Sequence, residues 1–390
     1  MKMSKRKEPI VLGFFLMFFL TVSLFCGSEE KSGTLVIKGA KIYTSGPRGV
    51  LAEASLLIEG GKIKKIIEGR DLPAGTAVDY SGKCIAPGLV DAHTYVSGYY
   101  RLLENSRDVT SDLEAFAAYD PLSPEVRAAL AEGITTVNLS PRNENLVGGI
   151  TSVLKLTTDS LGLPFLKKGK FLKVSFCKEV EREDRAPTSL MGAEEMLDEW
   201  MQKAGRNEGR TDILSEDGIV KLAKGELQPL IAASNYEEIN TTLKWLNDWK
   251  KRGVIVGGEE ASSFSDELKK NDVPVLLSPL LLSAPERVSQ NAASLFRKGV
   301  RIAFVSDMPE GEASGLRTSA LLLFHQGISQ DEALQTITLY PAQILGVADS
   351  VGSLEEGKDA DFIVFSGEPL DLGAKVVAVY SNGRLVHKQD

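Results

Sequence analysis

Strand-like patterns lie at both ends of the chain. Near the start, apolar and β-branched residues form three runs separated by glycine-containing turns, which is typical of β-strands. These runs cover residues 34–44, 55–69 and 77–86. Near the end, similar runs cover 362–365, 376–380 and 385–386. We expect the strands of both ends to combine into one domain.

The middle of the chain alternates short apolar runs with helical patterns, as in βα units built around a parallel sheet. Residues 124–133 predict a helix that Gly133 ends, and 134–139 predict the strand that follows. Residues 299–307 predict a late strand, and 330–339 with 341–345 the helix after it. The middle region, 88–345, has the length of one (β/α)8 barrel, which takes about 250 residues.

The first 26 residues predict an export signal. A basic start (Lys2, Lys5, Arg6 and Lys7) precedes an apolar run over 10–25, which is short for a membrane span. Cys26 follows this run and precedes a polar linker at 27–33. The segment resembles a bacterial lipoprotein signal, although Phe25 stands where a small residue is usual. We expect lipid attached to Cys26 and a membrane-anchored protein of the cell envelope; an uncleaved N-terminal anchor is the alternative.

Composition narrows the set of partners and sites. The net charge is −8, which argues against a nucleic-acid partner, because such a partner needs a basic face. Two cysteines lie beyond the signal, Cys84 and Cys177, and we expect them to be buried and unpaired. There are three histidines. His325 lies in an apolar helical segment and is expected in the core, whereas His387 is expected to be exposed.

The most informative stretch runs from Pro87 through Gly-Leu-Val-Asp-Ala-His-Thr to Tyr95. It is an apolar strand that ends in Asp91 and His93, so it aims polar side chains out of the edge of a sheet, where α/β barrels carry their chemistry. The stretch resembles the start of the barrel in the amidohydrolase superfamily, where the pattern is Pro-Gly-Leu-Val-Asp-x-His-x-His. Here Tyr95 replaces the second histidine. The run 351–361, with its Gly-Ser-Leu-x-x-Gly-Lys-x-Ala-Asp pattern, resembles a second signature of that family.

The resemblance implies a fold and an activity. The fold is α/β, with a (β/α)8 TIM barrel over 88–345 and a small composite β-sandwich formed by 34–87 and 346–390. The activity of the family is hydrolysis of non-peptide carbon–nitrogen bonds, using a divalent metal such as Zn²⁺ or Mn²⁺. Strand-end histidines, a carbamylated lysine and an aspartate hold that metal.

The resemblance also assigns roles to particular residues. His93 matches the first metal histidine, and Asp307 matches the aspartate that binds metal and accepts the proton of the hydrolytic water. Capping of the following helix is the structural alternative for Asp307. Lys155 is the lysine that the resemblance places best for carbamylation, with a solvent-facing lysine as the alternative.

Most of the other ligand positions hold residues that cannot bind zinc usefully: Tyr95, Ala232, Ser234 and Gly257. Two protein ligands hold a divalent ion weakly and do not fix its geometry. The next residues, Glu259 and Glu260, are expected to be solvated loop carboxylates.

Two hypotheses follow from this count. In the first, the protein is a degenerate amidohydrolase, inactive or weakly active, that has no cofactor and binds a small molecule or a protein at the barrel mouth. In the second, it is a working hydrolase of non-peptide carbon–nitrogen bonds that uses one metal between His93 and Asp307 plus an unrecognised ligand. Fold alone does not choose between them.

Overall fold

The computed structural model describes residues 34–69, 76–157, 165–206 and 217–389. The predicted signal, the linker and Cys26 lie outside these residues. No helix in the described ranges is long and apolar enough to cross a membrane.

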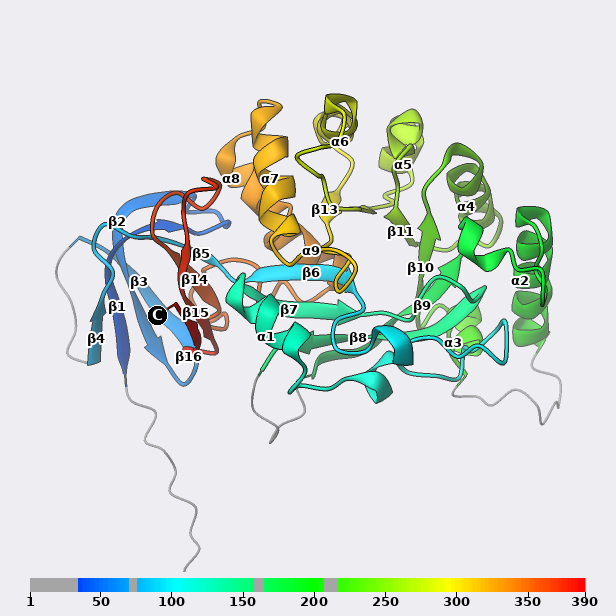
Figure 1. Cartoon of the computed structure of the whole chain (residues 1–390), viewed down its shortest axis with the longest axis horizontal. Coiled ribbons are helices and arrows are strands. Elements are labelled where there is room, and N and C mark those ends of the chain that lie inside the picture. Colours follow the sequence, from blue (N-terminus) through cyan, green and yellow to red (C-terminus); the bar gives the residue numbers. More distant parts are fainter. Residues whose placement is uncertain (1–33, 70–75, 158–164, 207–216, 390) are drawn as a thin grey trace, which may run out of the picture. The chain divides into compact units, whose positions relative to one another are not determined.

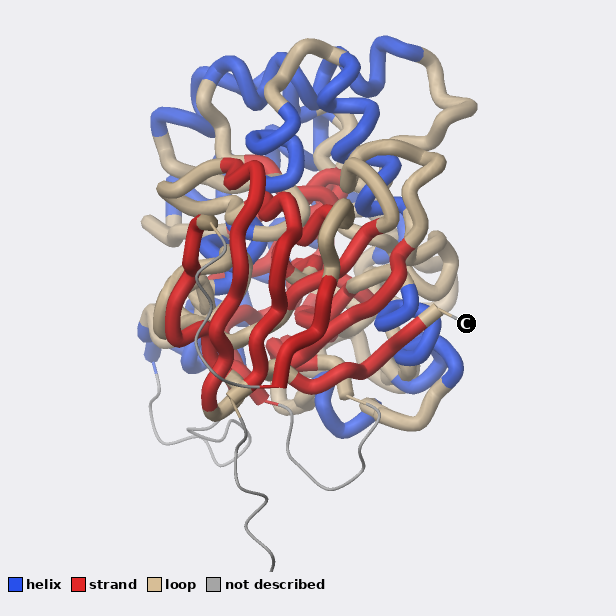
Figure 2. The backbone as a smooth tube through the Cα atoms, turned by 90° about the vertical axis from the view of Figure 1, so that its left-hand side faces the viewer, coloured by secondary structure: helices blue, strands red, loops and turns tan. Residues whose placement is uncertain are grey.

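The strands of the two chain ends share one eight-stranded sheet, in the order β16-β15-β14-β5-β1-β2-β3, with β4 paired to β1. Its members are β1 (Leu35–Tyr43), β2 (Val50–Glu59), β3 (Lys62–Glu68), β4 (Thr76–Asp79), β5 (Cys84–Pro87), β14 (Phe362–Phe365), β15 (Val376–Ser381) and β16 (Arg384–Lys388). The antiparallel pairing of β5 with β14 joins the two ends, and Figure 2 shows these strands side by side. The sheet thus unites both segments, while the bounds of a separate sandwich domain stay a prediction.

A second eight-stranded sheet forms a nearly closed barrel, in the order β13-β12-β11-β10-β9-β8-β7-β6. Its strands are β6 (Leu89–Thr94), β7 (Ile134–Leu139), β8 (Val147–Lys155), β9 (Phe165–Ser175), β10 (Gln228–Ala233), β11 (Val254–Gly257), β12 (Val275–Leu277) and β13 (Ile302–Phe304). The mixed α/β fold with a TIM-like barrel is confirmed. The regular βα alternation is not, because β8 runs antiparallel to both β7 and β9.

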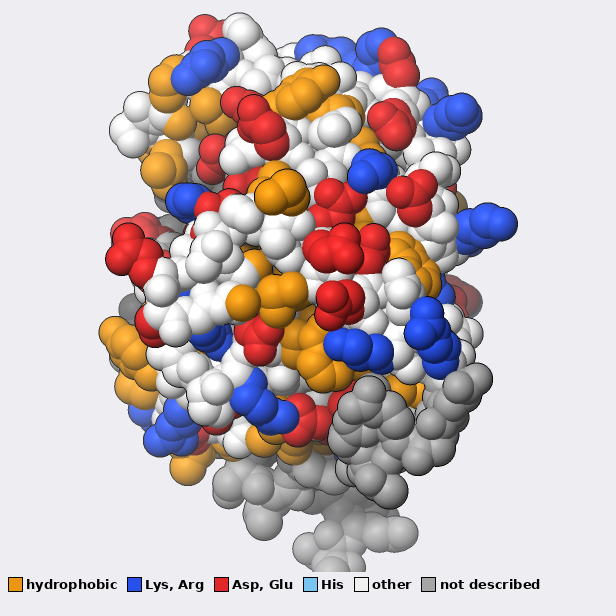
Figure 3. Space-filling view, turned by 90° about the vertical axis from the view of Figure 1, so that its right-hand side faces the viewer, with side chains coloured by type: hydrophobic (Ala, Val, Ile, Leu, Met, Phe, Trp, Pro, Cys, Tyr) orange, Lys and Arg blue, Asp and Glu red, His pale blue; other side chains and the backbone are white. Residues whose placement is uncertain are grey.

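Helices connect most of the remaining barrel strands and lie on their outer side (Figure 1). They are α1 (Pro124–Ala131), α2 (Leu190–Arg206), α3 (Gly218–Lys224), α4 (Tyr236–Asp248), α5 (Ser265–Lys270), α6 (Glu286–Lys298), α7 (Gly315–His325), α8 (Gln330–Gln335) and α9 (Leu339–Leu345), with short 3₁₀ turns η1 (Tyr99–Arg101), η2 (Ala115–Ala118), η3 (Lys178–Val180) and η4 (Ala261–Phe264). On the face that Figure 3 shows, acidic and basic side chains are interspersed.

Local sequence explains where several helices begin and end. Ser123 caps α1 by accepting a hydrogen bond from the Val126 amide, and Pro124 occupies the first turn. Asn235 forms a capping box at the start of α4. The helix predicted over 330–345 is instead two helices, α8 and α9, with a break at 336–338.

The cysteine prediction is confirmed, since Cys84 and Cys177 are both buried and free. The prediction for His325 is wrong. This residue ends α7 on the exposed side of the helix, and other residues of α7 form its buried side. His387 in β16 is partly exposed.

Candidate functional site

Asp91 ties the first barrel strand to the last. It lies in β6, is 1% exposed, and accepts hydrogen bonds from the backbone amide of Ser306 at 3.3 Å and from the Ser306 hydroxyl. Burial raises the pKa of Asp91 to about 7, while the hydrogen bonds from Ser306 oppose that rise. Because Ser306 follows β13, this contact closes the barrel beside the site, and Asp91 has a structural role.

His93 and Lys173 meet inside the barrel. Lys173, in β9, is fully buried, and its Nζ lies 3.5 Å from His93 Nε2. In the described part of the chain, no group hydrogen-bonds to the buried His93 Nδ1. Burial lowers the pKa of Lys173 to about 8, and burial together with the charge of Lys173 holds the pKa of His93 well below its usual range. At pH 7 the pair is therefore a neutral imidazole beside an ammonium.

Asp307 completes the cluster from the end of β13. Its backbone is left-handed, with φ of 53°, and its side chain hydrogen-bonds with Ser278, which follows β12. Burial raises the pKa of Asp307 to about 6, and the positive charge of Lys173 opposes that rise. Helix capping does not explain Asp307, because the next helix, α7, begins after Ser314. The structure thus brings the two predicted residues, His93 and Asp307, to the same edge of the barrel.

Tyr95 covers His93 rather than replacing a ligand. The two rings lie edge to face with centroids 5.1 Å apart, and the Tyr95 hydroxyl donates to Asn143 Oδ1 at 3.3 Å. This arrangement agrees with the expectation that Tyr95 packs at the barrel mouth. Its hydroxyl stays protonated, because burial raises its pKa well above the usual range.

The backbone at Gly257 disfavours a side chain at a position that the resemblance assigns to a metal ligand. Gly257 ends β11 with φ of 100°, and a Cβ atom placed on it would lie 2.3 Å from Ser234 Oγ. A histidine at this position would need both a strained backbone and the displacement of Ser234. The local packing therefore favours glycine at position 257.

Lys155 does not belong to this site, which corrects the prediction that placed it there. Its Nζ lies 2.6 Å from Asp359 and 3.0 Å from Asp361, and it donates to Asn382. Because β8 is antiparallel to β7, Lys155 pairs with Thr136 near the start of β7, at the edge of the barrel opposite to His93. It joins the barrel to the sheet of the chain ends.

Lys173 is the residue that sequence reasoning missed. Its signal was a lone lysine inside an apolar strand, in Phe-Leu-Lys-Val-Ser-Phe over 171–176. Placing it beside His93 requires the register of β9 against β10, where Lys173 pairs with Leu230. That register comes from the fold, because all residues of β9 from 171 to 175 are buried and the sequence there shows no alternation.

In their unmodified form the residues of the site do not supply a full shell for a divalent metal ion; a carbamylated Lys173 would add a third ligand to His93 and Asp307. Within the described ranges, no three His, Cys, Asp or Glu residues are grouped so that they could hold one. His93 Nε2 lies 3.5 Å from Lys173 Nζ, whereas His93 Nδ1 has no hydrogen-bond partner among the described residues. Closed metal shells use about four ligands, or three and a water.

These features define a TIM-like barrel protein whose polar cluster lies at the carboxyl edge of the strands. The chain belongs to the amidohydrolase family, whose profile matches residues 84–386. Members of this family are generally metal-dependent.

Relatives and solved structures agree with this assignment. The imidazolonepropionase of Pseudomonas entomophila is 27% identical over 377 residues, covering 85% of this chain and 92% of the relative. The chain spans only 39% of the longer amidohydrolase tasK of Hapsidospora irregularis, with 20% identity over 384 residues. The crystal structure of an amidohydrolase from Thermotoga maritima superposes with a TM-score of 0.81 and 26% identity, covering 91% of this chain and all of that one.

Proposed function

We propose that this chain has lost the metal-dependent hydrolysis of its family and binds a small molecule at the barrel mouth. One observation carries the proposal: Lys173 Nζ lies 3.5 Å from His93 Nε2, so an unmodified lysine places a cation against one of the two nitrogens through which His93 could bind a metal. The backbone conformation at Gly257 and the edge-to-face packing of Tyr95 on His93 support it. Without hydrolysis, the proposed function of the barrel mouth is to bind a small molecule.

Metal analysis of the full chain tests this proposal. The protein is purified without chelator, incubated with Zn²⁺ or Mn²⁺, freed of excess ion and measured by elemental analysis. We expect substoichiometric metal that does not change in the His93→Ala variant. A stoichiometric metal that His93→Ala removes would refute the proposal.

A working hydrolase is the second candidate, because the structure brings His93 and Asp307 together at one edge. In that case the substrates are cyclic amides and related compounds with non-peptide carbon–nitrogen bonds. With a pKa of about 6, Asp307 is mostly a carboxylate at pH 7 and would act as general base for water. Turnover that Asp307→Asn abolishes would favour this candidate, and turnover without loss in that variant would exclude it.

We further propose that the protein is exported and anchored in a bacterial envelope membrane by a lipid on Cys26. The basic start, the short apolar run and the cysteine before a polar linker support this. Labelling with a radioactive fatty acid tests it in cells. The label should follow the wild-type chain and be absent from Cys26→Ala; equal labelling of both chains would refute the proposal.

A further inference from the structure

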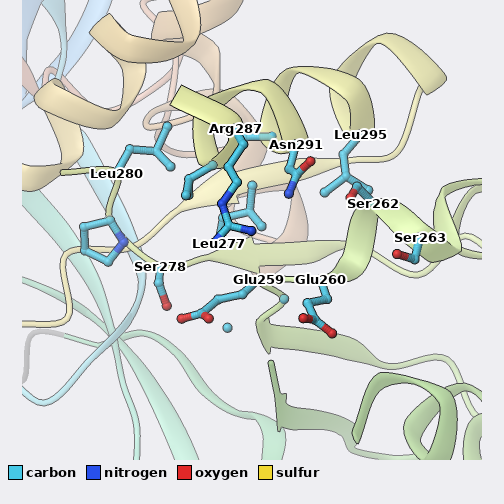
Figure 4. A pocket seen from close by; sticks show the side chains of 15 residues that line it. Glu259, Glu260, Ser262, Ser263, Leu277, Ser278, Leu280, Arg287, Asn291 and Leu295 are labelled. Carbon is cyan, nitrogen blue, oxygen red and sulfur yellow. The ribbon is translucent and has the colours of Figure 1, made fainter. Parts of the chain in front are cut away.

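A cavity of about 590 Å³ lies beside the cluster of His93, Lys173 and Asp307. Its walls are the residues that follow β11, the residues that follow β12, and one face of α6 (Figure 4). A volume of this size is typical of small-molecule sites. Ser278 connects the cavity to the cluster, because it lines the cavity and its side chain hydrogen-bonds with Asp307.

Two opposite charges extend into this cavity from different walls (Figure 4). Arg287 projects from α6 and Glu259 from the turn after β11, and both line the cavity. Throughout the described residues, neither side chain forms a hydrogen bond or an ion pair, with each other or with a third group. Both residues are exposed, and both charges are available to a ligand group.

The local backbone explains why Glu259 faces the cavity. Gly257 and Gly258 both have left-handed φ angles, of 100° and 61°, so the chain turns away from the direction of β11 before Glu259. The neighbouring Glu260 is already in use, because its carboxylate accepts a hydrogen bond from the Tyr236 amide at 2.8 Å. Glu259 is thus the carboxylate that is free for a ligand.

The opposite wall offers donors for an anion. Arg287 and Asn291 are four residues apart on α6, so both lie on the same face of the helix and both line the cavity. A guanidinium binds a carboxylate through two parallel hydrogen bonds, and an amide next to it supplies a further donor. This wall suits a carboxylate, while the Glu259 wall suits an ammonium.

We propose that this cavity binds a zwitterionic ligand of the amino-acid or short-peptide class, with its carboxylate on Arg287 and Asn291 and its ammonium on Glu259. The inference rests on the proposed ligand-binding function and names the ligand class. A ligand with both charges interacts favourably with both walls. A purely anionic ligand is repelled by Glu259, and a purely cationic ligand is repelled by Arg287. The two charges therefore select against ligands that carry only one.

Calorimetric titration of the full chain with L-alanyl-L-alanine, its N-acetyl form and its C-terminal amide tests the proposal. We expect the free dipeptide to bind and each blocked form to bind at least about tenfold more weakly. Arg287→Met should weaken the free dipeptide about tenfold and leave the amide unchanged. Glu259→Gln should weaken the free dipeptide similarly and leave the N-acetyl form unchanged. Lys270→Met and Glu267→Gln on the exposed side of α5 are the matched controls and should change nothing.

Absence of binding by all three forms would overturn the proposal. So would binding that Arg287→Met and Glu259→Gln leave intact, including binding that only His93→Ala removes. Zinc analysis of the same samples keeps the two proposals separate. Stoichiometric zinc would refute the proposed loss of metal binding. The ligand proposal for the cavity would still be decided by how Arg287→Met and Glu259→Gln change the binding of the free and blocked dipeptides.

Discussion

Replacing Lys173 with methionine should stabilise the protein at neutral pH. The pKa of Lys173 falls from its ordinary value of 10.5 to about 8 because its ammonium is fully buried. A shift of this size corresponds to about 3 kcal/mol of destabilisation while the group is charged in the folded state. Methionine fills a similar volume and carries no charge, so Lys173→Met should raise the free energy of unfolding by about that amount at pH 7.

The pH dependence gives the sharper test. Between pH 8 and pH 10.5 the unfolded chain holds a proton on Lys173 that the folded chain has released. Stability therefore rises with pH across this window, by about 1.4 kcal/mol per pH unit relative to a chain without the lysine. The cost of the buried charge is present in full below pH 8 and is gone above pH 10.5.

Urea unfolding of the wild type and Lys173→Met at several pH values from 7 to 10.5 measures this difference. We expect the variant to be more stable by about 3 kcal/mol at pH 7 and the two proteins to converge near pH 10.5. Lys65→Met, at an exposed lysine of β3, is the control and should show no such convergence. A difference that is constant with pH, or a variant that is less stable at pH 7, would refute the assignment of Lys173 as a desolvated ammonium.

Three further predictions concern other parts of the chain. Lys155→Met should lower the free energy of unfolding in urea by about 3–5 kcal/mol, because it leaves the buried Asp361 without its ion-pair partner. Lys62→Met, at the exposed end of the same network, should cost less than about 1 kcal/mol; equal losses would contradict this. Gly257→Ala should lower the thermal midpoint more than Gly225→Ala, since both glycines have positive φ but a Cβ has open space only at 225; a smaller effect at 257 would show that the packing yields. In cells, Cys26→Ala should move the protein from the membrane fraction to the aqueous fraction after detergent phase separation, and no redistribution would contradict a lipid anchor.

The sequence was sufficient for the features that depend on local pattern. The strands at both chain ends, the barrel strand that carries Asp91 and His93, and the late strand that delivers Asp307 all follow from apolar runs and turn residues. Pairing partners and strand direction do not follow from such patterns.

Lys155 shows why strand direction matters. All residues of β8 are buried, so the strand has no alternation from which its direction could be inferred. A parallel β8 would carry Lys155 to the edge of His93, whereas the antiparallel strand carries it to the opposite edge. The same missing information hid Lys173, which lies at the correct edge because β9 is parallel to β10.

Under the proposed loss of metal binding, the missing ligands could not be restored one at a time, because the residues at those positions make contacts of their own. A histidine at position 257 would adopt a left-handed backbone and displace Ser234, and a histidine at position 95 would lose the hydrogen bond that Tyr95 donates to Asn143. Either change would still leave the Lys173 ammonium facing His93 Nε2. Under that proposal, a metal shell would require coupled changes at Tyr95, Lys173 and Gly257.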